Sequence, residues 1–165
     1  MKTKENLMAA FAGESQANRR YLAFAKKAEK EGLTNIARFF RAIAEAETIH
    51  ALKHLEVAGK VGSTRENLAE AVEGEKHEYT EMYPEFIEEA KKEDNKQALR
   101  SFEFANEAEK VHGGIFQQLK ARAEANEDAG DEDIVLCKVC GWVGQGAMPE
   151  RCPICNSKPQ MMVTF

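Results

Sequence analysis

Two Glu-x-x-His pairs carry the clearest chemical signal in this sequence. Residues three apart in a helix point to nearly the same side, so both side chains of such a pair can bind one metal centre. The sequence places one further glutamate ahead of each pair, at corresponding positions of an internal repeat. One glutamate from each of two helices, with Glu-x-x-His from each of two others, is the ligand set of di-iron carboxylate bundles. The residues are Glu14, Glu47, His50, Glu75, Glu109 and His112.

A charged outer face is the alternative interpretation of any single glutamate in this set. It suits the whole set poorly, because apolar residues such as Ile49 and Val111 adjoin both histidines. Carboxylates that face inward repel one another and their pKa values rise, so such an interior requires cations. The repeat also contains one unmatched carboxylate, since Glu78 corresponds to Ala17. An unequal site can treat its two metals differently, which suits redox chemistry better than storage.

The second signal is a pair of Cys-x-x-Cys motifs near the C-terminus. All four cysteines belong to them: Cys137, Cys140, Cys152 and Cys155. Four thiolates at this spacing form a tetrahedral site whose usual occupants are zinc or iron. The spacing predicts a metal without selecting between a structural zinc and an iron.

The residues between the N-terminus and about Asn126 predict helices. They are rich in Ala, Glu, Lys and Leu, and the apolar residues recur at helical spacing. Glycines mark the breaks, Ser63 and Glu66 have capping-box spacing, and Pro84 should kink the helix that contains it. The predicted helices are about 3–31, 34–58, 64–93 and 95–126, and their short turns predict an antiparallel four-helix bundle.

The composition changes after Asn126. We expect a bundle domain over 1–126, an acidic linker over 127–134 and a small metal domain over 135–165, which is too short for a core without a metal. His112 lies about 14 residues before the end of the fourth helix, roughly 20 Å along a rigid rod. We therefore expect the tail to begin well away from its own chain's bundle metals. A folded-back tail could close the gap, but the like charges of the linker disfavour a compact hairpin. We expect each tail to lie beside the partner's bundle metals in a head-to-tail homodimer.

Composition narrows the possible partners. A formal net charge of −5 argues against nucleic acid, which needs a clustered basic face. No stretch approaches the roughly 20 apolar residues of a membrane span. The N-terminus does not read as a signal peptide, and no cysteine is left for a disulfide framework, so we expect a cytoplasmic protein.

The whole chain resembles the rubrerythrins. The matching stretches are Ala12-Gly13-Glu14-Ser15, Ala46-Glu47-Thr48-Ile49-His50, Gly74-Glu75 through Glu78, Glu81-Met82-Tyr83-Pro84, Glu107-Ala108-Glu109 through His112, and both cysteine pairs. Gly141, Trp142 and Cys152-Pro153 favour the rubredoxin pattern in the tail. The resemblance implies a ferritin-like all-α bundle followed by a small β-rich rubredoxin-like domain.

The resemblance also implies an activity and its residues. Rubrerythrins reduce hydrogen peroxide to water at two non-haem irons, with electrons passed through an Fe(Cys)4 centre and drawn ultimately from NAD(P)H through a separate reductase or rubredoxin. Carried over by position, the bundle irons would be held by Glu14, Glu47, His50, Glu75, Glu78, Glu109 and His112. Glu78 and His50 would exchange as ligands of one iron, while Tyr21 and Tyr83 would donate hydrogen bonds to ligand glutamates.

Two competing functions follow from the same residues. A ferritin-like ferroxidase or iron store would use the bundle alone, but storage needs no built-in electron donor. A non-enzymatic zinc-bearing binding module would use the bundle only as a scaffold, but it leaves the seven bundle ligands unexplained. The sequence therefore predicts an oxidoreductase, a peroxide reductase of the rubrerythrin type.

Overall fold

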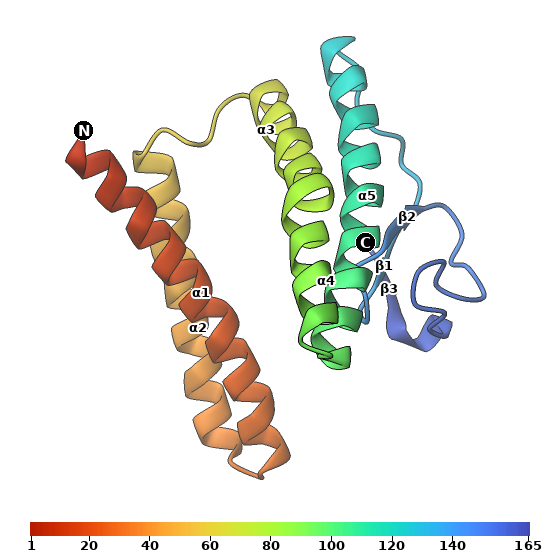
Figure 1. Cartoon of the computed structure of the whole chain (residues 1–165). Coiled ribbons are helices and arrows are strands. Elements are labelled where there is room, and N and C mark those ends of the chain that lie inside the picture. Colours follow the sequence, from red (N-terminus) through yellow and green to blue (C-terminus); the bar gives the residue numbers. More distant parts are fainter. The chain divides into compact units, whose positions relative to one another are not determined.

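The computed structural model describes all 165 residues, in two compact units, Met1–Gly62 and Ser63–Phe165. Four long helical stretches precede a small three-stranded sheet, which confirms the predicted fold class (Figure 1). The observed helix limits agree with the predicted ones to within two residues. None of these helices is both long and apolar enough to cross a membrane.

The first unit is a hairpin of α1 (Lys2–Lys30) and α2 (Thr34–Val57). Gly32 has a φ of +79° and ends α1, and the Leu33 N–H returns to the Ala28 carbonyl at 2.9 Å. Small side chains let the two helices approach closely. The buried alanines are Ala17, Ala25, Ala28, Ala37, Ala44 and Ala51. The buried Asn18 Nδ2 joins the helices by donating to the Ala44 carbonyl and to Thr48 Oγ1, each at 2.7 Å.

The second unit begins with a capping box in which the Ser63 N–H donates to Glu66 Oε2 at 2.8 Å. Its helices are α3 (Thr64–His77), α4 (Tyr83–Lys92) and α5 (Lys96–Glu124). A π-helical stretch, Glu78–Met82, joins α3 to α4 and is called the π segment below. Pro84 lies in the first turn of α4, where its missing N–H is tolerated. The predicted disruption at this proline thus takes the form of a π segment followed by a new helix start.

The tail forms β1 (Ile134–Cys137), β2 (Val143–Gln145) and β3 (Met162–Thr164), after a 3₁₀ turn at Pro159–Met161. The sheet is antiparallel in the order β2-β1-β3. Its core is Val135, Cys137, Cys152 and Met162, with Cys140, Trp142, Ile154 and Cys155 packed around them. Half of these side chains are thiols, so a metal must supply much of the tail's stability.

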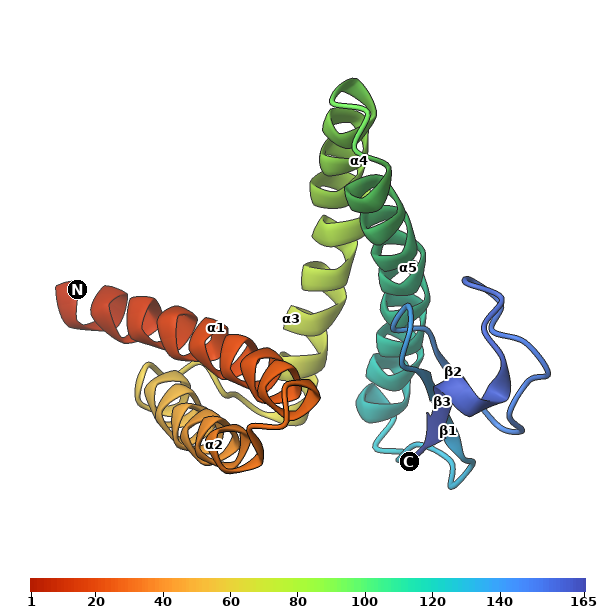
Figure 2. The same ribbon diagram turned by 90° about the horizontal axis from the view of Figure 1, so that it is seen from below.

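The linker folds back along α5, as both views of the chain show (Figures 1 and 2). Asn126 has a φ of +60°, and the Glu127 N–H donates to the Arg122 carbonyl at 2.9 Å, which reverses the chain. Arg65 of α3 secures this reversal, because its Nε donates to the Ala123 carbonyl at 2.9 Å and its Nη2 to Asn126 Oδ1 at 2.6 Å. The linker therefore folds back, and the expectation that it leaves the tail away from its own chain's bundle metals is wrong. The linker's own negative charges do not hold it extended, because these bonds fix its first residues.

Candidate metal centres

Each unit contains one group of three metal-ligand side chains. In the first unit, Glu14 of α1 lies with Glu47 and His50 of α2, and their nearest ligand atoms all fall within 4.8 Å of one another. His50 Nδ1 is 3.1 Å from Glu47 Oε2. The three-residue spacing of α2 thus brings the pair together as predicted, and α1 adds the third donor. We call this group the first half-site.

The second half-site repeats the plan with Glu75 of α3 and with Glu109 and His112 of α5. His112 Nδ1 lies 2.6 Å from Glu109 Oε2 and 3.9 Å from Glu75 Oε2. All three side chains are about one fifth exposed, at 19% for Glu75, 17% for Glu109 and 21% for His112. The same donors therefore converge here in a more buried setting than at His50, which is 57% exposed.

The electrostatics of the second half-site fit a cation. Burial, with a hydrogen bond and charge repulsion from Glu109, raises the pKa of Glu75 to about 7. Its buried Oε2 atom has no hydrogen-bond partner. Two carboxylates and an imidazole that point at one another, with one oxygen unsatisfied, form a donor set that a divalent iron would complete.

The four cysteines converge in the tail. Their sulfur atoms lie within 4.8 Å of one another, with Cys137 Sγ 3.6 Å from Cys155 Sγ and Cys140 Sγ 3.5 Å from Cys152 Sγ. Burial raises the pKa of the Cys140 and Cys152 thiols. Burial also acts to raise the pKa of Cys155, but hydrogen bonds with Ser157, Cys140 and Cys152 together outweigh it and lower that pKa to about 6. The four side chains are thus close enough to coordinate one metal ion, and they would bind it as deprotonated thiolates.

A hydrogen bond links the cysteine cluster to the second half-site. His112 Nε2 donates to the Gly141 carbonyl at 2.9 Å, while Nδ1 of the same ring faces Glu109. Gly141 follows Cys140 directly, and its N–H donates to the Cys137 carbonyl at 2.9 Å. Its φ of +82° favours glycine. The imidazole therefore has one nitrogen toward each metal centre, with its tautomer fixed by the carbonyl.

Comparisons with known proteins agree over nearly the whole chain. The family model for rubrerythrin matches residues 5–120. The chain belongs to the rubrerythrin family. Rubrerythrin-2 of Clostridium acetobutylicum is 39% identical over 99% of this chain and 96% of its own length, and nigerythrin of Nitratidesulfovibrio vulgaris is 40% identical over 93% and 81%. The solved structure of partially reduced nigerythrin covers 99% of this chain and 86% of its own, at 34% identity and a TM-score of 0.59.

Membership of the rubrerythrin family confirms the predicted cofactor types. The carboxylate–histidine groups are of the di-iron kind, and the cysteine cluster is of the Fe(Cys)4 kind. The position of the fifth carboxylate is distinctive. Glu78 opens the π segment outside the group of three, and burial followed by the charge of Glu109 raises its pKa.

The two predicted tyrosines lie in equivalent aromatic clusters. Tyr21 packs near Phe24 and Phe40, with ring centroids at 6.3 and 6.2 Å. Tyr83 packs near Phe86 and Phe102, at 6.2 and 6.4 Å. Burial and the charges of the nearby glutamates raise the pKa of Tyr83. The hydrogen bonds expected from both hydroxyls to ligand glutamates stay a prediction.

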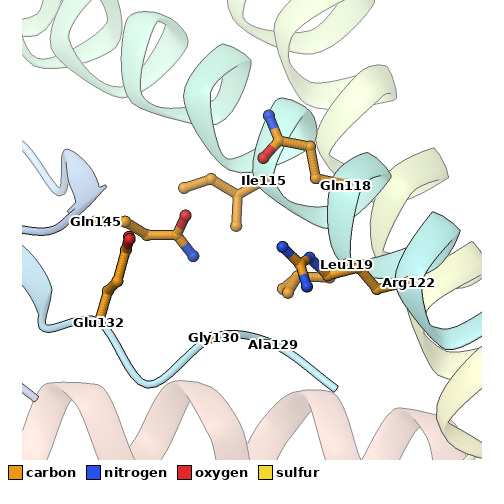
Figure 3. A pocket seen from close by; sticks show the side chains of 8 residues that line it. All are labelled: Ile115, Gln118, Leu119, Arg122, Ala129, Gly130, Glu132 and Gln145. Carbon is orange, nitrogen blue, oxygen red and sulfur yellow. The ribbon is translucent and has the colours of Figure 1, made fainter. Parts of the chain in front are cut away.

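Two adjoining cavities lie between α5 and the returning linker. The smaller, of about 110 Å³, is lined by α5 residues including Gln118 and Arg122, by Gly130 and Glu132 of the linker and by Gln145 of β2 (Figure 3). The larger, of about 350 Å³, shares part of this lining and extends along apolar α5 side chains to Glu75 and His112. The larger cavity therefore reaches two residues of the second half-site along a mostly apolar wall.

Sequence reasoning missed the role of the Gly141 carbonyl, because a backbone acceptor has no residue type to search for. His77 lies between Glu75 and Glu78 in the sequence, but its exposed ring pairs with Glu81 at 3.2 Å. Gly113 lies in the interior of α5, where it is buried against Tyr79 of the π segment.

Proposed function

We propose that this chain reduces hydrogen peroxide to water at two non-haem irons, with electrons delivered through its Fe(Cys)4 centre. The single observation that carries the proposal is the His112 contact, which joins a carboxylate–histidine half-site to the cysteine cluster through one imidazole. The seven bundle ligands are those predicted from the sequence. Solved nigerythrin has been described in a fully reduced, all-ferrous state, which supports iron as the metal.

The chain's residues have separate parts in this reaction. The irons, when bound, supply the two electrons that the O–O bond takes up. Glu75, Glu109 and His112 hold metal, and two of them, Glu75 and His112, line the larger cavity, whose mostly apolar wall suits a small uncharged molecule. The raised pKa of Tyr83 keeps its phenol protonated at neutral pH, so its hydroxyl can donate a hydrogen bond beside the glutamates. Tyr21 has the corresponding place in the first unit.

Iron storage is the weaker alternative. A ferroxidase needs no thiolate cluster beside its carboxylates, whereas here the cluster contacts a ligand histidine. Electrons would enter the cluster from a rubredoxin or a separate reductase that draws on NAD(P)H. The cytoplasmic location expected from the cysteine pattern stays a prediction.

The cysteine variant Cys137→Ser/Cys152→Ser tests the proposal. It should retain the bundle irons and lose steady-state peroxide reduction with reductase and NAD(P)H. The same protein, reduced chemically beforehand, should still consume one equivalent of peroxide per di-iron site. Normal steady-state turnover in this variant would show that the cluster is not the donor.

The predicted homodimer bears on the path of the electrons. The sequence predicts transfer between chains because the tail begins well away from its own chain's bundle metals, but the returning linker supplies a contact within one chain. Mixing the cysteine variant with Glu47→Ala/Glu109→Ala, which lacks bundle ligands, distinguishes the two paths. Confirmed heterodimers that regain turnover carry electrons between chains, whereas inactive heterodimers confine them to one chain.

A further inference from the structure

The two helix pairs differ by one residue, and the difference falls in the π segment. Glu14 and Tyr21 are seven residues apart, whereas Glu75 and Tyr83 are eight apart. Both tyrosines nevertheless lie in matching aromatic clusters and both glutamates in matching half-sites. An α-helix turns about 100° per residue, so one extra residue would swing Tyr83 by about that angle. The π segment absorbs the difference, because the Tyr83 N–H bonds to the Glu78 carbonyl five residues back.

The wider turn accompanies a change from alanine to glutamate. Ala17 follows Glu14 by three residues and is only 9% exposed within a continuous α-helix. Glu78 follows Glu75 by the same three residues, but it opens the π segment and is half-buried. It lies near enough to Glu109 and His112 to interact electrostatically with both. The insertion thus makes room for a carboxylate where the first helix pair accommodates a methyl group.

Tyr79 holds this turn against α5. A Cβ added at Gly113 would meet Tyr79 Cε1 at 3.1 Å, so any other residue there would push the tyrosine ring out of its present position by a few tenths of an ångström. The first helix pair has the buried Ala51 at the corresponding place. Glycine destabilises a helix interior relative to alanine. The chain therefore keeps an unfavourable residue at the one point where the ring needs the space.

We propose that Tyr79 is a positioning residue for Glu78: seated on Gly113, its ring fixes the π segment, and the π segment holds the Glu78 carboxylate at the second half-site. The inference rests on the proposed function, because it takes that half-site to bind iron. An anionic oxygen stabilises ferric iron more than ferrous iron, since the higher charge is attracted more strongly. A correctly placed Glu78 therefore lowers the reduction potential of the bundle irons.

A double-mutant cycle in the iron-loaded full chain tests this, with the reduction potential of the bundle irons as the readout. Tyr79→Leu and Glu78→Gln should each raise the potential, and the double variant should shift it no further than Glu78→Gln alone. Tyr79→Phe keeps the ring and should restore the original potential. Additive shifts, or no shift in Tyr79→Leu, would overturn the inference.

A matched pair on α5 gives a second measurement that leaves Tyr79 in place. Gly113→Ala crowds the ring and should shift the potential in the same direction as Tyr79→Leu, whereas Gly114→Ala, which meets nothing within 4 Å, should leave it unchanged. Equal potentials in the two alanine variants would contradict the role of Tyr79. If the unaltered chain binds no iron at its carboxylates, the proposed function itself fails. If the chain binds iron but its reduction potential does not change in the Tyr79 variants, only the inference about Tyr79 fails.

Discussion

Replacing Glu75 by glutamine should change stability in opposite directions with and without metal. Glu75 stands beside Glu109 with a buried oxygen that has no hydrogen-bond partner, and its pKa rises to about 7. In the metal-free protein above that pH, the ionised carboxylate destabilises the native state. A glutamine amide has the same shape, carries no charge and can donate a hydrogen bond to Glu109. The variant should therefore stabilise the metal-free protein and weaken metal binding.

The size of the effect follows from the pKa. A rise from 4.5 to about 7 means that the unfolded chain loses this proton first as the pH increases, so the native state loses stability between those values and none below them. At about 1.36 kcal/mol for each pKa unit, the upper limit of the loss is about 3–4 kcal/mol. Partial exposure to water screens the charges and reduces it to roughly 1–2 kcal/mol. Glu75→Gln should thus raise the melting temperature of the metal-free protein at pH 8 by roughly 2–8 °C.

The assay is thermal unfolding followed by circular dichroism at pH 5 and pH 8, with and without ferrous iron under anaerobic conditions. Glu73→Gln removes an exposed charge from the same helix and serves as the control. The gain in Glu75→Gln should be large at pH 8, small at pH 5 and reversed when iron is present. A loss of stability at pH 8 in the metal-free variant would refute the argument from charge repulsion.

Three further changes test the scaffold. Ser63→Ala should lower the free energy of unfolding by about 1 kcal/mol in urea titrations, because it removes the capping box. Asn18→Ala should cost about 1–3 kcal/mol in the same assay, since it deletes one buried and one partly buried hydrogen bond between α1 and α2 and leaves the Ala44 carbonyl without that donor. Lowering the pH should release metal from the cysteine cluster, because protons compete for the thiolates, and the near-ultraviolet signal of Trp142 should be lost together with the metal. A Trp142 signal that survives metal release would show that the tail folds without it.

Local signals explain why the helices could be predicted. Gly32 and Ser63 begin or end helices through interactions with residues a few positions away, so the sequence contains the whole cause. The return of the linker could not be predicted, because it depends on Asn126 adopting a left-handed conformation and on a long-range bond from Arg65. The π segment lies between these cases. Glu75 and Tyr83 are one residue further apart than Glu14 and Tyr21, and this difference in the repeat indicates an inserted residue. Only the backbone shows that a π-helical turn accommodates it.

Because the returning linker is short, it keeps the cysteine cluster at a high effective concentration near the second half-site. Seven residues, 127–133, separate the end of the α5 reversal from β1, and a flexible chain of that length has an end-to-end distance of roughly 14 Å. A group tethered so closely meets its target at an effective concentration in the millimolar range, on the order of that for other short linkers. A contact centred on one imidazole–carbonyl hydrogen bond can then keep the cysteine cluster docked for much of the time, yet release it to meet a reductase. If the proposed function holds and the path lies within one chain, electron delivery from the docked tail would be a first-order process, which diluting the protein does not slow.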